Sequence, residues 1–387
     1  MGGGAALQRR LFGGYTGGAL IYVSAFPDPE ARMPQWLLHE YAMNPSPSRG
    51  KWGLGRARLI LSCMPGTSYV RRLKSIFERH HIQAVHAVAH EFLWISAIVA
   101  AKQLELKIGV AVHDHWPSTV AGQLPKVLGE AVWGALLRQA DVVYTAHEEA
   151  SAMLWGMYQI QAAGVERDGL EGGELSDALS GKPSAKVGSS GLLTVGYAGM
   201  YHTYKQEISD LHQALRVVCA SDTRFRRFRL VACTDCATQE MIQDGWQAEE
   251  VANRGWQEYE KVAEAMEDCD FVFLPMSFER QHADRMRWGM PVKTVPYLRS
   301  RRPILVYGPP YSSVAGLFSE CGGAVVVTEH GPGPLLAGIR DLLEARTHPR
   351  EAFERQQSEC LEERFNLTRI RSMVYSSLGL PAAKDQD

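Results

Sequence analysis

The segment from residue 290 to 310 reads MPVKTVPYLRSRRPILVYGPP, and it decides the fold. Its pattern predicts a helix over Val292–Arg299 and then a buried strand over Pro303–Tyr307, which Gly308 ends. A helix that leads into a buried strand is the order in which an open α/β sheet is built. Lys293 stands at the start of that helix, where a cation beside free backbone N–H groups can hold an anionic leaving group.

Length and composition narrow the class of protein. The chain has 387 residues, 45% of them hydrophobic, which predicts two domains with separate cores. A net charge of −2 gives no electrostatic case for nucleic acid as a partner. Seven scattered cysteines indicate a reducing, cytoplasmic location and not a disulfide framework. We expect no transmembrane segment, which leaves peripheral membrane contact and the oligomeric state open.

Short apolar runs alternate with helical patterns in the first 161 residues. The expected strands are Ala19–Phe26, Arg56–Met64, Gln83–Val88, Lys107–Val112 and Asp141–Thr145. The expected helices are Met33–Met43, Ser68–His81, Phe92–Leu104, Leu124–Gln139 and Glu148–Gln161. This alternation predicts a parallel sheet covered on both faces, so residues 1–161 should form one Rossmann-like domain. The glycine-rich stretch before the first strand is interpreted as a flexible leader, because a dinucleotide-binding glycine motif would follow its strand.

The rest of the chain repeats this organisation. Residues 162–190 are rich in Gly, Ser, Asp and Glu, and we expect a flexible interdomain linker there. Residues 191–365 predict a second Rossmann-like domain, and residues 366–387 a C-terminal helix with a polar tail. The strands expected in this domain are Leu192–Tyr197, Phe228–Ala232, Val251–Gly255, Phe271–Leu274, Pro303–Tyr307 and Ala324–Val327.

A strand, a glycine turn and a helix start follow one another from residue 193 to 205. Gly199 would let the backbone approach a ligand closely, and the next helix would point free N–H groups at it. Lys205 would add a positive charge for a phosphate group. The alternative is a simple tight turn followed by a solvated lysine.

Histidines and cysteines raise the question of a metal. His113 and Asp114 follow an expected strand, where they could hydrogen-bond a sugar hydroxyl or stabilise charge at a reacting carbon. Two alternatives are a structural His–Asp pair and a metal site that His113 and His115 would share with His86 or His90. Cys233 and Cys236 form a single C-x-x-C without a second pair, so no metal is expected there.

Several of these segments resemble retaining GT-B glycosyltransferases of the family 4 type. The segment from 290 to 306 is similar to their Pro-Ser-Lys-Leu…Glu-Tyr-Leu…Pro-Ile-Leu signature. The family pattern Gly-Arg-Leu, three residues, Lys-Gly is matched at Gly199 and Lys205, with Met200 in place of arginine and Gln206 in place of glycine. The resemblance implies two Rossmann-like domains that face one another across a cleft, and transfer of a sugar with retention of configuration.

The resemblance also implies the composition of the active site. A site of this family needs no metal and no cofactor besides the nucleotide-sugar donor, and its acceptor is a carbohydrate-type molecule. The residues implied to be catalytic are His113, Asp114, Lys205 and Lys293. The residues implied to bind the donor are Gly199, Met200, Gly255, Trp256, Glu279, Thr294, Tyr297, Gly308 and Ser312.

One departure keeps other functions open. The family carries two glutamates eight positions apart, and here those positions hold Trp288 and Pro296. Glu279 is the nearest acid that could substitute if its loop folds back. A catalytically degenerate binding or assembly protein is therefore one alternative, and a nucleotide-sugar epimerase with the same fold is another.

Overall fold

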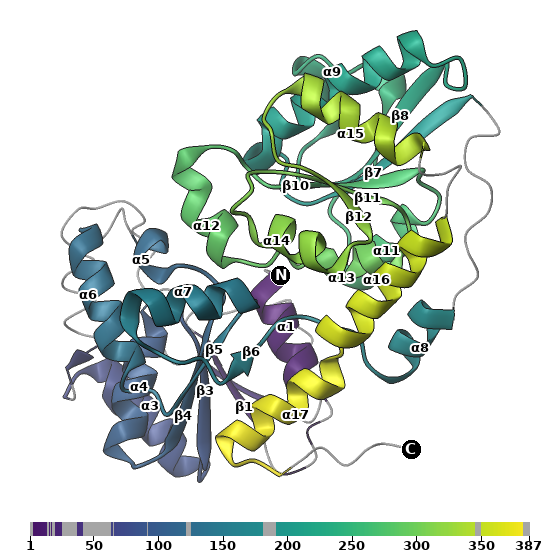
Figure 1. Ribbon diagram of the computed structural model, residues 1–387. Helices are drawn as coiled ribbons and strands as arrows, with labels where there is room; N and C mark the ends of the chain where they lie inside the picture. The colour runs from purple at the N-terminus through teal and green to yellow at the C-terminus, as the bar shows by residue number, and fades with distance from the viewer. Residues whose placement is uncertain are drawn as a thin grey trace. The chain divides into compact units, whose positions relative to one another are not determined.

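A computed structural model describes residues 3–13, 15, 17, 20–24, 37–41, 63–64, 66–90, 92–120, 125–180, 191–344 and 350–381. The chain divides into two compact units. Unit 1 comprises Met1–Arg167 together with Arg369–Asp387, and unit 2 comprises Asp168–Thr368. Each unit is built on its own parallel sheet (Figure 1).

Unit 2 contains a six-stranded parallel sheet in the order β12-β11-β10-β7-β8-β9. Its strands are β7 (Leu192–Ala198), β8 (Arg227–Cys233), β9 (Val251–Asn253), β10 (Phe271–Pro275), β11 (Ile304–Tyr307) and β12 (Ala324–Val327). The strand order reverses between β7 and β10, because the chain first builds outward from β7 and then returns to its other side. Ligands of open α/β sheets bind at such a switch point, beside the carboxyl ends of the strands.

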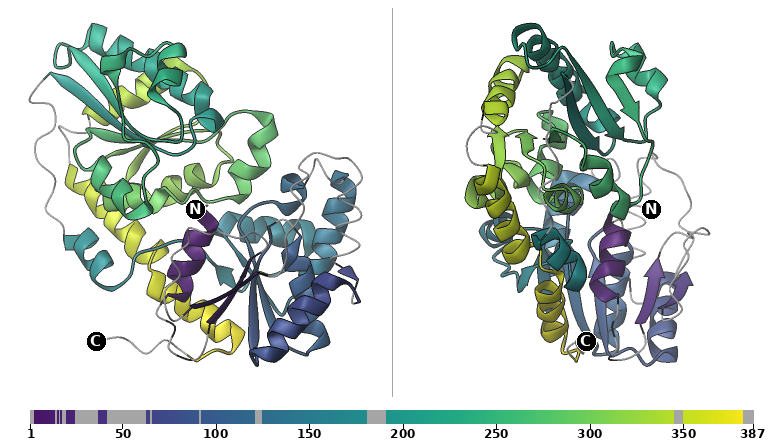
Figure 2. Two further views of the ribbon diagram at one scale, coloured as in Figure 1. Left: turned by 180° about the vertical axis from the view of Figure 1, so that it is seen from behind. Right: turned by 90° about the vertical axis from the view of Figure 1, so that its right-hand side faces the viewer.

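Helices cover both faces of this sheet. The helices of unit 2 with eight residues or more are α8 (Gly172–Ser180), α9 (Lys205–Ser221), α11 (Tyr259–Met266), α14 (Ser313–Cys321), α15 (Pro332–Glu344) and α16 (Arg350–Arg364). The shorter ones are η1 (His202–Tyr204), α10 (Thr238–Gln243), η2 (Ala248–Glu250), η3 (Arg280–His282), α12 (Ala283–Trp288) and α13 (Thr294–Arg299). In two opposite views, α9 and α15 lie on one face and α11, α13 and α14 on the other (Figures 1 and 2).

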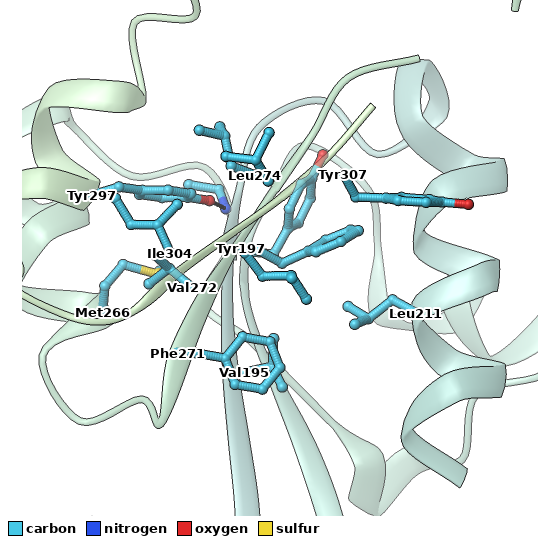
Figure 3. Close-up of a cluster of buried hydrophobic side chains, with 14 of the residues drawn as sticks. Val195, Tyr197, Leu211, Met266, Phe271, Val272, Leu274, Tyr297, Ile304 and Tyr307 are labelled. Atoms are coloured by element: carbon cyan, nitrogen blue, oxygen red, sulfur yellow. Dashed lines mark hydrogen bonds between the residues drawn. The ribbon is translucent and has the colours of Figure 1, made fainter. Parts of the chain in front are cut away.

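The core of unit 2 is apolar around the central strands. All five residues of β10 are buried, as are all four of β11, which is the pattern of strands covered on both faces. Figure 3 shows β-strand residues such as Val195, Val272 and Ile304 packed between side chains from the helices, among them Leu211 and Met266. The segment that we quoted first thus forms α13 and β11, as its pattern predicts.

Unit 1 has a four-stranded parallel sheet in the order β3-β4-β5-β6. Its strands are β3 (Ala84–Val88), β4 (Lys107–Val112), β5 (Val142–Thr145) and β6 (Gly164–Val165). Its helices include α3 (Ser68–Arg79), α4 (Leu93–Gln103), α5 (Trp116–Thr119), α6 (Lys126–Leu137), α7 (Glu148–Tyr158) and α17 (Leu367–Leu378). Thr67 caps the start of helix α3, because its side chain accepts the N–H of Val70.

The N-terminal region differs from the sequence prediction. A helix, α1 (Gly3–Phe12), stands in the first part of the expected leader, and Leu11 in it is fully buried. It is held because Arg371 of α17 donates to the carbonyls of Leu11 and Arg10, a contact between distant segments that local sequence does not encode. Residue 37 begins a strand, β2 (Leu37–Tyr41), where we expected a helix. It pairs in parallel with β1 (Leu20–Ser24). The expected strand at residues 56–64 lies almost entirely outside the described residues.

The expected linker also contains folded structure. Within residues 162–190, β6 extends the sheet of unit 1 beside β5, and α8 belongs to unit 2. Glu166 in this segment is fully buried. Its polar, glycine-rich composition suggested a loop, but buried polar partners far away in sequence fix it. Residues 181–190 lie outside the described residues. Among the described helices, none is both long and apolar enough to span a bilayer.

Candidate functional site

The turn after β7 prepares a place for a ligand. Gly199 follows this strand with φ +136°, a backbone angle that favours glycine. Its N–H donates to the carbonyl of Cys233 at 3.0 Å, which ties the turn to the end of β8. The chain then forms η1 and enters α9 at Lys205. The expected order of strand, glycine turn and helix is therefore present.

Lys293 brings a buried amine to this turn. Its Nζ is inaccessible to solvent and has no hydrogen-bond acceptor among the described residues, although other atoms of the residue are partly exposed. The Nζ lies 4.5 Å from the ring centroid of Tyr204 and 5.0 Å from that of Tyr197. A Cβ added at Gly199 would lie 3.3 Å from it. Aromatic faces lie against this amine, but no anionic group among the described residues accepts a hydrogen bond from it, which a buried charged group needs.

The environment changes the protonation of this amine. Burial and, to a smaller extent, the positive charge of Arg285 lower the pKa of Lys293 to about 7, although the negative charge of Glu207 opposes the shift. The amine therefore titrates near neutral pH. An anion bound beside it would favour the ammonium form, so ligand binding and protonation of Lys293 are coupled.

Lys205 lies in a different environment. Its side chain is 54% exposed, and its Nζ lies 2.6 Å from Oδ1 of Asp244. Asp244 also accepts the hydroxyl of Tyr201 at 2.9 Å. Lys293 and Lys205 thus have different neighbours, one aromatic and one a carboxylate. Because it already forms an ion pair, Lys205 would have to exchange Asp244 for a phosphate in order to act as we expected.

Two buried carboxylates on α9 were missed. Glu207 and Asp210 are 1% and 2% exposed. Glu207 Oε1 accepts the N–H of Phe278 at 2.9 Å, and Asp210 Oδ2 accepts the hydroxyl of Tyr307 at 2.6 Å. His330 Nε2 also lies 3.3 Å from this oxygen. A signal was present in the sequence: Glu207 stands four residues before Leu211 and Asp210 four residues before Ala214, on the helix face that is buried.

Four of the predicted donor-binding residues are packed in the interior. Thr294, Tyr297 and Ser312 are fully buried, and a Cβ at Gly308 would meet Met276 at 2.4 Å. The hydroxyl of Tyr297 accepts the N–H of Ala198 at 2.6 Å (Figure 3). Through this bond α13, which Lys293 precedes, is fixed to the end of β7.

Ser312 keeps one feature of a ligand site. It is the residue before α14, and its Oγ is buried without a hydrogen-bond partner among the described residues. Met200 is partly buried, and its carbonyl accepts the hydroxyl of Tyr197 at 3.0 Å. Its side chain is not a cation, so it cannot replace the arginine that the resembling family carries.

Two further residues that were predicted to bind the donor, Trp256 and Glu279, are exposed. Trp256 is 57% exposed, which is unusual for a side chain of this size. It follows Gly255, whose φ is +68°. The side chain of Glu279 is 52% exposed and lies 3.6 Å from that of His282. Trp288 and Pro296, at the positions of the family's two glutamates, are both buried, so no carboxylate reaches the site from there.

The predicted histidine of unit 1 is held by the missed Glu166. Oε1 of Glu166 lies 3.2 Å from Nε2 of His113 and accepts the amide of Gln8 at 2.9 Å, while Oε2 lies 2.6 Å from Nε2 of His86. Burial by itself would raise the pKa of Glu166, but the two imidazoles outweigh burial and hold this pKa well below its usual range. Asp114 beside His113 is partly buried.

This geometry bears on the metal alternative for these histidines. His115 points to other groups, with Nδ1 2.6 Å from the hydroxyl of Ser118 and Nε2 3.3 Å from Glu130. His113 and His115 are therefore engaged by different carboxylates. The described part of unit 1 holds no group of three histidine, cysteine or acidic side chains close enough to share a metal ion.

Comparison with known proteins shows the fold. No protein-family model matches the sequence, and no curated protein sequence matches it. Among solved structures, sucrose-phosphate synthase from Thermosynechococcus elongatus is 13% identical with a TM-score of 0.67, and the match covers 98% of this chain and 94% of that one. HepE from Anabaena, solved in complex with UDP, is 13% identical with a TM-score of 0.57, over 89% and 86% of the two chains.

TarM is a further neighbour, 11% identical with a TM-score of 0.57; the match covers 80% of this chain and 58% of TarM. This chain thus spans less than two thirds of that neighbour. Taken together, these likenesses confirm the predicted fold class, the GT-B fold with its two Rossmann-like domains. Membership of family 4 stays a prediction.

Proposed function

We propose that this chain is a glycosyltransferase that takes a sugar from a nucleotide-sugar donor. The observation that carries the proposal is the buried Nζ of Lys293 beside the Gly199 turn, with no acceptor among the described residues. Such an amine, at the carboxyl end of a central strand, is suited to the diphosphate of a donor. The fold supports this reading, because neighbours with the same fold include a trehalose-phosphate synthase described as UDP-forming.

In this proposal the second unit stabilises the leaving group. Transfer breaks the bond between the sugar carbon and the diphosphate oxygen, and negative charge grows on that oxygen. The ammonium of Lys293 and the backbone N–H groups near Gly199 and at the start of α9 would stabilise it. Lys205 would contribute after leaving Asp244. A charge-assisted hydrogen bond contributes about 1.5–3 kcal/mol, so one lysine is not sufficient and the backbone groups matter.

The finer features of the reaction rest on the sequence resemblance. We propose retention of the anomeric configuration, no metal in the chemical step and no cofactor beyond the donor. His113, positioned by Glu166, would interact with the sugar from unit 1. Seven free cysteines agree with the proposed cytoplasmic location. The exposed Trp256 would offer a flat surface to the nucleotide base.

The first experiment measures binding of UDP, GDP and ADP to the full chain by titration calorimetry. Lys293→Met is the test variant, and Lys261→Met, whose lysine is 61% exposed beside Glu258, is the matched control. We expect one nucleoside diphosphate to bind the wild type and the control alike, with affinity for Lys293→Met about 10- to 100-fold weaker, as loss of a charge-assisted bond implies. Equal affinity in all three proteins would remove Lys293 from the site.

The pH dependence gives a second readout. Since the pKa of Lys293 is about 7 and an anion prefers the ammonium, diphosphate binding should take up a proton above that pH. Calorimetry in two buffers of different ionisation enthalpy measures this uptake. Affinity should fall by up to about tenfold for each pH unit above 7, and the fall should be absent in Lys293→Met. A flat profile in the wild type would contradict the assignment.

A catalytically inactive binding protein is the second candidate, and buried Trp288 and Pro296 in place of two acids favour it. Incubation of the full chain with nucleotide sugars separates the two functions. Release of nucleoside diphosphate with transfer or hydrolysis, lost in Lys293→Met, supports the enzyme. Binding without turnover over the whole donor and acceptor panel supports the binding protein. The anomer of any product, read by NMR, tests retention.

A further inference from the structure

Three potential metal ligands meet in unit 2, outside the residues used above. His202 Nε2, Cys236 Sγ and a carboxylate oxygen of Glu240 all lie within 4.8 Å of one another. The distance from His202 Nε2 to Glu240 Oε2 is 3.3 Å. Cys236 is 3% exposed, whereas the side chains of His202 and Glu240 are 64% and 46% exposed. A buried sulfur with two accessible partners forms a site that an ion can enter from solvent.

The spacing suits a tetrahedral zinc ion. Zinc binds histidine nitrogen and carboxylate oxygen at about 2.0–2.2 Å, so two such ligands at a tetrahedral angle stand about 3.3 Å apart. The distance between His202 and Glu240 matches that edge. The donor set of imidazole, thiolate and carboxylate is one that zinc accepts, whereas magnesium and calcium prefer oxygen alone.

The fold brings the ligands together from separate segments. Strands β7 and β8 are paired in parallel, with Ala198 opposite Cys233 at their ends. His202 lies in η1 after β7, and Cys236 and Glu240 lie in the loop after β8 and in the first turn of α10. Neighbouring parallel strands therefore deliver the two sides of the site to the same edge of the sheet.

Two of the ligands are oriented by hydrogen bonds. The side chain of Asn253 donates to the carbonyl of Cys236 at 2.6 Å, which holds the thiol-bearing residue from β9. Glu240 Oε1 accepts the N–H of Ala237 at 3.2 Å, so that Oε2 is the oxygen turned to His202. Partners of this kind fix the direction of a ligand before an ion arrives.

The surrounding charge also favours a cation. The negative charges of Asp235, Glu240 and Asp244 act on the thiol of Cys236, and the positive charge of Lys205 opposes them. Lys205 is itself paired with Asp244. The local balance among these groups is therefore negative, which attracts a divalent cation.

We propose that His202, Cys236 and Glu240 bind a zinc ion, with a fourth position for water or another ligand. On binding, the hydrogen bond from Cys236 Sγ to the carbonyl of Ala237 is lost, and the thiol proton passes to the buffer. The ion would clamp η1, which follows the Gly199 turn, to α10. The zinc would stabilise this edge of the sheet, and the proposal does not depend on glycosyl transfer.

The site differs from the one that a C-x-x-C suggests. Cys233 is not part of the group, although it stands three residues before Cys236. The partners of Cys236 come instead from positions 202 and 240, so no short sequence motif contains them. A search of the sequence for a second cysteine pair therefore could not find this site.

The experiment titrates the metal-free full chain, without affinity tag, with Co²⁺ and then with Zn²⁺. We expect one Co²⁺ per chain, with tetrahedral visible bands and a thiolate charge-transfer band that Zn²⁺ abolishes. Cys236→Ser should remove the charge-transfer band, and His202→Ala and Glu240→Gln should each weaken zinc by at least about 10- to 100-fold, the loss that even outer-shell changes produce.

Matched controls exclude an unspecific effect. His282→Ala removes a similar exposed histidine–glutamate pair that lacks a cysteine, and Cys219→Ser removes a partly buried thiol elsewhere. Both should bind like the wild type. The surface variants His202→Ala and Glu240→Gln keep the test decisive if Cys236→Ser does not fold. The proposal is overturned if Co²⁺ gives no thiolate band, or if the band survives in Cys236→Ser or disappears in Cys219→Ser.

Discussion

Oε1 of Glu207 accepts a hydrogen bond from the backbone N–H of Phe278 at 2.9 Å, so a carboxylate on α9 holds the loop that follows β10. Burial raises the pKa of Glu207, and the bond from Phe278 opposes burial only in part. The negative charge of this carboxylate also acts to raise the pKa of Lys293. The fold therefore keeps Glu207 buried, despite the loss of its hydration, at a place where its charge favours the ammonium form of Lys293. The proposed diphosphate site needs that ammonium.

The first prediction concerns Glu207→Gln. Because the folded-state pKa is raised, the stabilising contribution of Glu207 is complete below its unfolded value of 4.5 and is lost as the pH rises through the folded value. The amide mimics the protonated acid and can still accept from Phe278. Compared with the wild type, the variant should therefore gain about 1 kcal/mol in free energy of unfolding once the pH rises above 4.5, where the wild type begins to lose this contribution.

Denaturant unfolding followed by circular dichroism at several pH values measures this gain. Gln213→Glu, which changes the charge at an exposed position of α9, controls for a general effect of charge on this helix. A variant that is less stable than the wild type at the highest pH would show that the charged, hydrogen-bonded form of Glu207 is the favoured one.

The second prediction compares two glycines with positive φ. Gly199 has φ +136° and would crowd the amine of Lys293 at 3.3 Å, whereas Gly245 has φ +102° with no atom within 4 Å of an added Cβ. Alanine at either position should cost about 1–2 kcal/mol through backbone strain. Only Gly199→Ala should also weaken nucleoside diphosphate binding, because it fills the space beside Lys293. Calorimetry on both variants decides; equal binding losses would mean that strain alone is responsible.

The sequence predicted most of unit 2 because its strands are continuous apolar runs. A segment such as Phe271–Pro275 is buried on both faces, so its pattern needs no knowledge of the partner strand. Gly199 was predictable for a similar reason, since a glycine between a strand and a helix has a local structural cause. Lys293 was identified through the resemblance, but its burial among tyrosine rings was not.

The failures have a common physical origin in long-range contacts. Helix α1 is held by Arg371, about as far away in sequence as the chain allows. Glu166 lay in a stretch whose composition suggests a linker, yet its oxygens bind His86, His113 and Gln8. Local propensity carries no information about such partners. The apolar periodicity of α9, by contrast, did mark Glu207 as inward-facing, and that signal was overlooked.

The third prediction concerns Trp256, an exposed side chain that is only partly packed against the rest of the protein. Its replacement by alanine should leave the unfolding midpoint nearly unchanged, because 57% of the side chain is already in solvent. If the ring stacks on the nucleotide base, binding should weaken by about 1–3 kcal/mol, and Trp256→Phe should recover part of it. Trp155→Ala, which removes another half-exposed tryptophan, is the control for calorimetry. Unchanged affinity in Trp256→Ala would exclude stacking.

The fourth prediction tests whether Glu166 is the electrostatic centre of unit 1. Its pKa is held well below the usual range by His86 and His113 against the effect of burial, so its contribution to stability is present above the unfolded value of 4.5 and is lost as the pH falls through the lower folded value. Glu166→Gln should therefore cost about 3–5 kcal/mol near neutral pH, the cost of removing the carboxylate from a buried, hydrogen-bonded cluster.

The free energy of unfolding at low pH separates the contribution of the Glu166 charge from that of its packing. As the pH drops below about 4.5, the unfolded chain takes up a proton at Glu166 while the folded protein does not, so the wild type loses stability and its difference from the variant should shrink. Lys102→Ala, which breaks a partly exposed ion pair with Asp141 at 2.7 Å, should cost about 1 kcal/mol or less at every pH above that range. A loss in Glu166→Gln that stays constant down to low pH would mean that shape and hydrogen bonding, not charge, hold the two histidines.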